Sequence, residues 1–153
     1  MGTTHGLGNE SPESFDVDGM LGRVAKWLRI LGFDATYPAG APSQGRFYVT
    51  TRRRIQYSGA IIVDSGPCLS QVKFILEHAG VRPDPQLILT RCLECNLPVQ
   101  EVSPERVRLK VPREVFTRSG KFNHCPACGR VYWAGSHRGR IMKRLKESGI
   151  RLD

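Results

Sequence analysis

Two matched cysteine pairs constrain this chain more than any other feature. Cys92 and Cys95 form one pair, Cys125 and Cys128 form the other, and two residues separate the cysteines within each pair. A tight turn of this length directs both sulfur atoms at a single ion, and two such turns complete the tetrahedral set of thiolates that suits Zn²⁺. Four thiolates leave no open coordination position, so the sequence predicts a structural zinc site rather than a catalytic one.

Two disulfide bonds are the alternative use of these cysteines, and they require an oxidising compartment. The first fifteen residues contain no apolar run that resembles a secretion signal, and no stretch is long and apolar enough to cross a membrane. We therefore expect a reducing, cytoplasmic setting, a bound metal rather than disulfides, and no membrane partner.

The chain is strongly basic, with a formal net charge of +9 at pH 7. A protein of this charge typically binds a polyanion, most commonly nucleic acid. The alternative is a solvated basic surface that only keeps the protein in solution. The residues that we predict to contact nucleic acid fall into three groups: Arg23, Lys26 and Arg29; Arg52, Arg53 and Arg54; and Arg138, Arg140, Lys143 and Arg144.

Composition and apolar periodicity divide the chain into four segments. Residues 1–14 are polar and predict a disordered tail, whereas residues 15–89 alternate strand-like and helix-like runs. Such alternation indicates an α/β layer with a small parallel sheet of about four strands and flanking helices. Residues 90–135 hold the cysteine pairs and predict the zinc ribbon, and residues 136–153 predict a basic C-terminal helix. We expect strands at residues 15–17, 34–37, 47–51 and 60–63, and helices at residues 18–32 and 70–79.

Asp18 stands where the first expected strand meets the first expected helix, which Gly32 should end. One interpretation makes its carboxylate the N-cap of that helix. The other makes it a ligand of Mg²⁺ or Mn²⁺, because metal-dependent nucleases of the PIN type hold a carboxylate at the end of a first strand. The local sequence is compatible with both.

Three long motifs occur in order along the chain. They are residues 18–34 (DGMLGRVAKWLRILGFD), residues 89–96 (LTRCLECN) and residues 125–137 (CPACGRVYWAGSH). Through them the sequence resembles the Mut-seven C-terminal RNase domain family from Phe15 to Leu145. The resemblance implies a PIN-like α/β domain with an appended zinc ribbon, and an RNA-cleaving activity that depends on acidic residues.

The sequence departs from the family pattern where the chemistry should be. After the third strand, where the family usually carries an acid, the chain has Arg53 in the middle of an arginine triplet. The acidic helix usually found before that strand is replaced by residues 38–45, which contain no carboxylate. Asp18 and Asp64 remain as candidate catalytic ligands of Mg²⁺ or Mn²⁺, with Asp16 as a further donor. The triplet opposes cation binding and favours phosphate, although a solvated loop is an equal alternative.

Three functions stay open at this point. The protein is an RNA-binding ribonuclease with a depleted acidic site, a module that binds RNA without hydrolysis, or an adaptor whose zinc ribbon contacts a protein partner. Convergence of three carboxylates within reach of one metal would favour the enzyme, and scatter would argue against it. The carboxylates in question are those of Asp16, Asp18, Asp34 and Asp64.

Overall fold

The structure is a computed structural model that describes residues 13–153. The expected disordered tail, residues 1–14, lies outside the described residues except for its last two. Ser14, which the sequence assigned to that tail, is the first residue of a strand.

Four parallel strands form the larger sheet: β1 (Ser14–Val17), β2 (Asp34–Thr36), β3 (Phe47–Thr50) and β4 (Ala60–Ile62). Their order across the sheet is β2-β1-β3-β4, so the chain moves to one side of β1 and then crosses back to the other. The strand order therefore reverses between β1 and β3. In parallel sheets, the crevice at the carboxyl ends of the strands beside such a reversal is where ligands bind.

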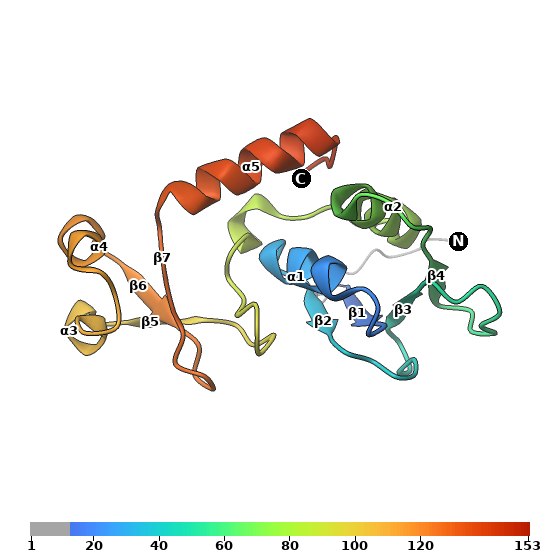
Figure 1. Ribbon diagram of the computed structural model, residues 1–153, viewed down its shortest axis with the longest axis horizontal. Coiled ribbons are helices and arrows are strands. Elements are labelled where there is room, and N and C mark those ends of the chain that lie inside the picture. Colours follow the sequence, from blue (N-terminus) through green and yellow to red (C-terminus); the bar gives the residue numbers. More distant parts are fainter. Residues whose placement is uncertain (1–12) are drawn as a thin grey trace, which may run out of the picture.

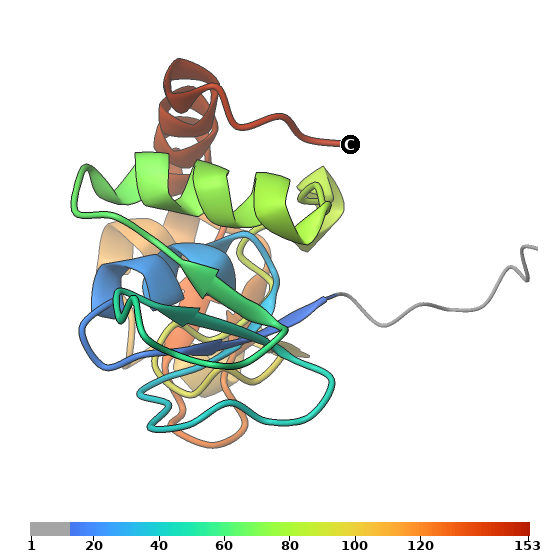
Figure 2. The ribbon, with the colours of Figure 1, turned by 90° about the vertical axis from the view of Figure 1, so that its right-hand side faces the viewer.

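Helices cover one face of this sheet (Figures 1 and 2). Helix α1 (Gly22–Ile30) joins β1 to β2, and α2 (Cys68–Ala79) follows β4 and packs against α1. The last helix, α5 (Ser136–Ser148), lies on α2 and buries Leu145 in the same core. The predicted parallel sheet with flanking helices is thus confirmed, and each predicted strand and α2 lie within two residues of their predicted bounds.

The start of α1 corrects one expectation, because the helix begins four residues after Asp18 rather than beside it. Leu21 occupies the N-cap position and no side chain caps the helix. At the other end, Gly32 has a φ of +93° and stops the helix as expected. A Cβ atom there would lie 2.5 Å from the carbonyl oxygen of Leu87, in the short helix η1 (Pro85–Leu87), so only glycine fits.

Residues 90–135, which we call the cysteine module, form a second and smaller sheet. It is antiparallel and consists of β5 (Gln100–Val102), β6 (Phe122–His124) and β7 (Val131–Trp133). Two short helices, α3 (Pro104–Val107) and α4 (Arg113–Arg118), connect β5 to β6. The module has a core of its own, made of Val102, Val107, Val111 and Phe122.

Helix α5 is basic as predicted, but it ends at Ser148, before Gly149, and does not continue to residue 153. It also has an apolar side. Ile141 and Met142 pack with Leu145 against the larger core, and the guanidinium of Arg144 lies 4.9 Å from the ring centre of Trp27. Within residues 13–153, no helix has both the length and the apolar character that a membrane span requires.

Candidate functional site

The four paired cysteines meet at one point, although they come from two hairpin-like turns. Cys92 and Cys95 precede β5, and the second pair lies between β6 and β7. The four Sγ atoms all lie within 4.8 Å of one another, and those of Cys92 and Cys128 are 3.8 Å apart. Four sulfurs bound about 2.3 Å from a common ion in a tetrahedron are about 3.8 Å apart. None of the cysteines is in a disulfide, so the cluster fits a metal ion.

Polar hydrogens surround these sulfurs. The hydroxyl of Tyr132 donates to Cys92 Sγ over 3.2 Å and accepts from the Leu93 amide over 3.1 Å. The Cys95 amide points at Cys92 Sγ from 3.4 Å, and the Arg130 amide points at Cys128 Sγ from 3.5 Å. Donors of this kind orient metal-binding thiolates and stabilise their negative charge.

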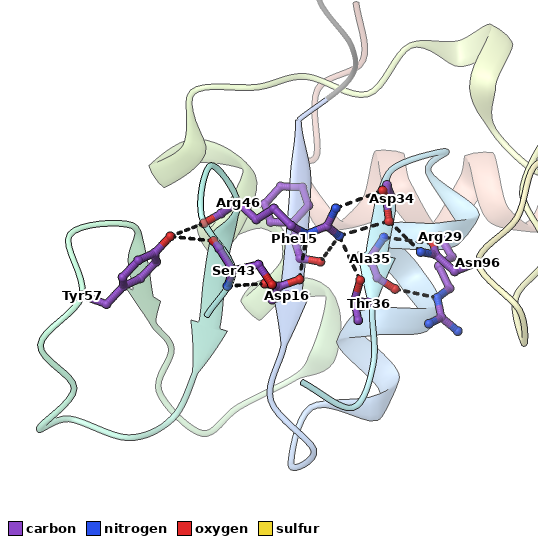
Figure 3. A network of polar contacts seen from close by, with 10 residues as sticks. All are labelled: Phe15, Asp16, Arg29, Asp34, Ala35, Thr36, Ser43, Arg46, Tyr57 and Asn96. Carbon is purple, nitrogen blue, oxygen red and sulfur yellow. Dashed lines mark hydrogen bonds and ion pairs between the residues drawn. The ribbon is translucent and has the colours of Figure 1, made fainter. Parts of the chain in front are cut away.

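The first cysteine turn is fastened to the outer edge of β2 (Figure 3). Asn96 follows Cys95 directly and has a φ of +62°, which turns its side chain onto the strand. Its Oδ1 accepts from the Ala35 amide over 3.0 Å, and its Nδ2 donates to Asp34 over 2.6 Å. Because β2 is an edge strand, this contact satisfies a backbone amide that would otherwise lack a partner.

Arg29 completes this junction, which corrects its prediction as a nucleic-acid contact. The residue is only 6% exposed, and its Nε donates to the Ala35 carbonyl over 2.9 Å. Its Nη1 donates to the Leu93 carbonyl, inside the first cysteine turn, over 2.7 Å. The guanidinium is therefore held by backbone carbonyls, although Arg29 also lines the hollow beside the first cysteine turn.

Arg46 neutralises two of the four candidate carboxylates, and no local pattern of residues predicts this contact. Its Nε donates to Asp16 over 2.7 Å, and its two terminal nitrogens reach both oxygens of Asp34 over 3.0 and 3.1 Å. The Ser43 amide donates to the other oxygen of Asp16 over 2.8 Å. Figure 3 shows Arg46 between the two acids, and its hydrogen bonds hold the pKa of Asp34 below its ordinary value.

Asp18 and Thr50 lie at the carboxyl ends of β1 and β3, on either side of the point where the strand order reverses. The Thr50 hydroxyl donates to Asp18 Oδ2 over 2.9 Å, and the Met20 amide donates to Oδ1 over 3.1 Å. Arg52 Nε is 3.4 Å from Oδ2. Burial raises the pKa of Asp18, but these two hydrogen bonds and the charge of Arg52 outweigh burial. The pKa of this carboxyl therefore lies below its ordinary value. Asp18 thus shapes the turn before α1 and is not its N-cap.

Asp64 follows β4. Its side chain is 78% exposed and forms an ion pair with Arg53. The four candidate carboxylates therefore pair with three different arginines: Asp16 and Asp34 with Arg46, Asp18 with Arg52, and Asp64 with Arg53. Among residues 13–153, the four cysteines are the one set of three or more potential metal ligands whose donor atoms come together.

The other predicted nucleic-acid contacts differ in whether their side chains already make contacts within the protein. Arg23 and Lys26 are exposed on α1, and Lys26 lies 3.7 Å from Glu94. Together with Tyr37 they line a hollow of about 500 Å³ beside the first cysteine turn. On α5, Arg138 donates to the carbonyls of Pro85 and Ile88, and the guanidinium of Arg144 lies over the ring of Trp27. Lys143 Nζ lies 3.9 Å from the carboxylate of Glu147. Arg140 is exposed.

Comparison with known proteins gives one positive finding. The family model described as Mut7-C RNAse domain matches residues 13–145, which is nearly all of the described chain. No curated protein and no solved structure matches the sequence. The match includes β1 with Asp18, the arginine triplet and both cysteine pairs, and the chain therefore belongs to the Mut7-C RNAse domain family.

Proposed function

We propose that this protein binds RNA by its phosphate groups at the carboxyl edge of the four-stranded sheet, and that it does so without metal-dependent hydrolysis. Membership of an RNase-domain family and the net charge of +9 support RNA as the ligand. The observation that carries the second half of the proposal is that no three acidic residues of the described chain bring their oxygens together, while each candidate carboxylate pairs with an arginine.

The arginine triplet supplies the phosphate contacts in this proposal. Arg52, Arg53 and Arg54 are exposed in the loop that leaves β3, beside the reversal of strand order. The side chains of Arg52 and Arg53 are 67% and 76% exposed, although each pairs with an aspartate. The Arg53–Asp64 pair is exposed on both sides, and such pairs contribute only about 0–1 kcal/mol, so a phosphate can displace Asp64 at small cost. Asp18 is buried, and it keeps its hydrogen bonds from Thr50 and Met20 when Arg52 turns to a phosphate.

The hollow beside α1 extends this surface. Arg23, Lys26 and Tyr37 line it, and the Tyr37 hydroxyl donates to the Gly19 carbonyl in the turn after Asp18. A single strand that leaves the triplet therefore finds further cations and one aromatic ring for base stacking. Arg29 also lines the hollow, but its guanidinium donates to backbone carbonyls, and those of Arg138 and Arg144 likewise serve contacts within the protein.

A metal-dependent nuclease needs several carboxylate oxygens around each ion. Arg46 occupies Asp16 and Asp34, and the Thr50 hydroxyl and the Met20 amide occupy both oxygens of Asp18. At this edge a metal ion would therefore find the carboxylate of Asp18, which already has hydrogen-bond partners. A phosphate group would find the three arginines of the triplet.

The test is binding of a single-stranded oligouridylate, followed by fluorescence anisotropy. If three phosphates are contacted, affinity falls roughly 20-fold between about 50 and about 200 mM salt. Replacing Arg52, Arg53 and Arg54 together by glutamine should weaken binding about tenfold or more and lower the salt slope by about 2. The control replaces Arg106, Arg113 and Arg118, which are exposed in the cysteine module and give the same change of charge.

Hydrolysis is tested with the same RNA in Mn²⁺ and in EDTA. We expect the RNA to remain intact in both. Manganese-dependent cleavage that disappears in Asp18→Ala would contradict the proposal and establish the ribonuclease alternative. Equal loss of affinity in the triplet variant and its control would show that the edge is not the binding surface.

We infer that the ion of the cysteine cluster is zinc, in a structural role. An all-thiolate tetrahedral set favours zinc and leaves no position for a water or a substrate. Elemental analysis of purified protein should find about one zinc per chain. Cys128→Ser should lose it, whereas Cys68→Ser should keep it, because Cys68 lies in α2 outside the cluster.

A further inference from the structure

Helices α2 and α5 end in the same way. Gly80 and Gly149 follow them in the left-handed conformation, with φ values of +70° and +77°. An apolar residue comes next in both cases, and then an arginine. The matching residues are Gly80, Val81 and Arg82 after α2, and Gly149, Ile150 and Arg151 after α5.

This shared ending fixes where the two arginines lie. The Val81 amide donates to the Leu76 carbonyl over 3.1 Å, and the Ile150 amide donates to the Leu145 carbonyl over 3.2 Å. Such caps satisfy the last carbonyls of a helix with backbone amides, so those carbonyls need no arginine. A helix C-terminus also favours a cation in its last turn, but His78 and Lys146 already hold that position. The two arginines are therefore unexplained by the helices themselves.

Both arginines line one cleft between the two helix ends. The cleft measures about 960 Å³ and has an apolar floor that includes Leu76 and Ile150. Lys73 and Lys146 also line it, and Glu77 is the one carboxylate among its lining residues. A Cβ atom on Gly149 would lie 3.3 Å from Lys73 Nζ, so a cation of α2 reaches the end of α5.

The charge of this cleft is poorly balanced. Lys73 Nζ is 3.9 Å from Glu77, but Arg82, Lys146 and Arg151 take part in no ion pair with the described residues. Arg82 also borders a second hollow, and three acidic residues line it: Glu13, Asp84 and Asp153. Glu13 directly precedes β1, so the cleft lies toward the amino edge of the sheet, away from Asp18 and the arginine triplet.

We propose that this cleft is a second anion site that binds a phosphate ester. An arginine fork donates two parallel hydrogen bonds to phosphate oxygens, and two forks from adjacent helix ends can hold one phosphate from two sides. The apolar floor receives the attached sugar or base. The phosphate belongs either to RNA that the protein holds or to a free nucleotide. In the first case the site deepens the proposed function, and in the second it adds to it.

The experiment uses the full chain and three probes: pyrophosphate, a nucleoside triphosphate without Mg²⁺, and the single-stranded oligouridylate. Pyrophosphate should shift the amide resonances of Gly80 and Gly149 more than that of Gly19, which lies at the carboxyl edge. The paired substitution Arg82→Gln with Arg151→Gln should weaken pyrophosphate binding about tenfold. Both side chains are exposed, so the fold should be unaffected, and circular dichroism checks this.

Arg106→Gln with Arg118→Gln is the matched control, because it removes the same charge from exposed positions of the cysteine module. A selective loss of oligouridylate affinity in the cleft variant identifies RNA as the phosphate source, and a selective loss of nucleoside triphosphate affinity identifies a nucleotide. Equal affinity of the cleft variant and its control for all three probes would overturn the proposal. Failure of the triplet variant to weaken RNA binding would refute the carboxyl-edge surface alone, so the two outcomes are distinguishable.

Discussion

The four-stranded layer and the cysteine module rely on very different amounts of apolar packing. Nineteen buried residues form the core of the layer, from Phe15 in β1 to Ile150 after α5. Four form the core of the module. A core of four side chains is too small to hold a sheet of three short strands, so the module depends on its sulfur cluster and on the layer beside it.

The contact between these two regions is polar rather than apolar. Asn96 and Arg29 join the first cysteine turn to the edge of β2, and Asn96 reaches Asp34, which Arg46 also holds. The cysteine cluster is thus linked by hydrogen bonds to the carboxylates of Asp34 and Asp16. The module thus covers the edge strand β2 of the layer, and the layer supports the first cysteine turn of the module.

Removal of the metal should have the largest effect on stability. It should destabilise the cysteine module much more than the four-stranded layer. Binding of zinc supplies about 10 kcal/mol or more to the folding of small zinc modules. In Cys128→Ser, amide hydrogens of β6 should lose protection from exchange, whereas those of β1 and β3 should keep most of theirs. Cys68→Ser is the control and should resemble the unchanged protein. Persistent protection of Phe122 in metal-free protein would show that four apolar residues suffice.

Loss of Arg46 should damage the layer without reaching the metal. Arg46→Met leaves the carboxylate of Asp16, whose side chain is 2% exposed, without its cation. Breaking a buried ion pair by removing one partner costs about 3–5 kcal/mol. Urea unfolding should show this loss, and adding Asp16→Asn should recover part of it. Arg54→Met, at an exposed position, should change stability by less than about 0.5 kcal/mol.

Features that depend on local sequence patterns could be predicted, whereas contacts between distant residues could not. Local patterns predicted the strands, α2, the stop at Gly32 and the meeting of the four cysteines, because periodicity and spacing act over a few residues. Arg46 escaped prediction because its partners Asp16 and Asp34 lie 30 and 12 residues away. No local pattern records which charge meets which across a sheet.

The same limit explains the two corrections. Asp18 was a plausible cap for α1, but its carboxylate accepts from Thr50, 32 residues later and on the neighbouring strand. Arg29 continued the cationic spacing of α1, but it faces a cysteine turn that begins more than 60 residues later. One feature of the sequence could have predicted the contact between the first cysteine turn and the sheet. It is the asparagine directly after the first cysteine pair, because asparagine tolerates the left-handed conformation and its side chain can form hydrogen bonds with nearby backbone.

Replacing Asn96 should weaken the junction by an intermediate amount. Asn96→Gly keeps the φ of +62° accessible and removes both side-chain contacts, one of them to a backbone amide of β2. Leaving such a group without a partner costs about 1–3 kcal/mol. Asn96→Ala should cost about 1 kcal/mol more, because alanine resists the left-handed region. Equal stability of the glycine variant and the unchanged protein, measured by urea unfolding, would show that the junction contributes nothing.

Acid should reveal the smallest effect, at the same junction. Hydrogen bonds from Arg46, and secondarily from Asn96, lower the pKa of Asp34 from its ordinary value of 3.8 in spite of partial burial. A carboxyl whose folded pKa is depressed adds stability above its unfolded pKa and loses it as the pH falls through the folded value. Asp34→Asn should therefore be less stable than the unchanged protein at neutral pH, and the difference should shrink as the pH falls below the ordinary value of 3.8. Acid also protonates the thiolates and releases metal, but that loss is common to both proteins, so the difference between their urea midpoints isolates Asp34. A difference that stays constant as the pH falls from neutral to well below 3.8 would mean that the ion pair with Arg46 does not stabilise the charged form of Asp34.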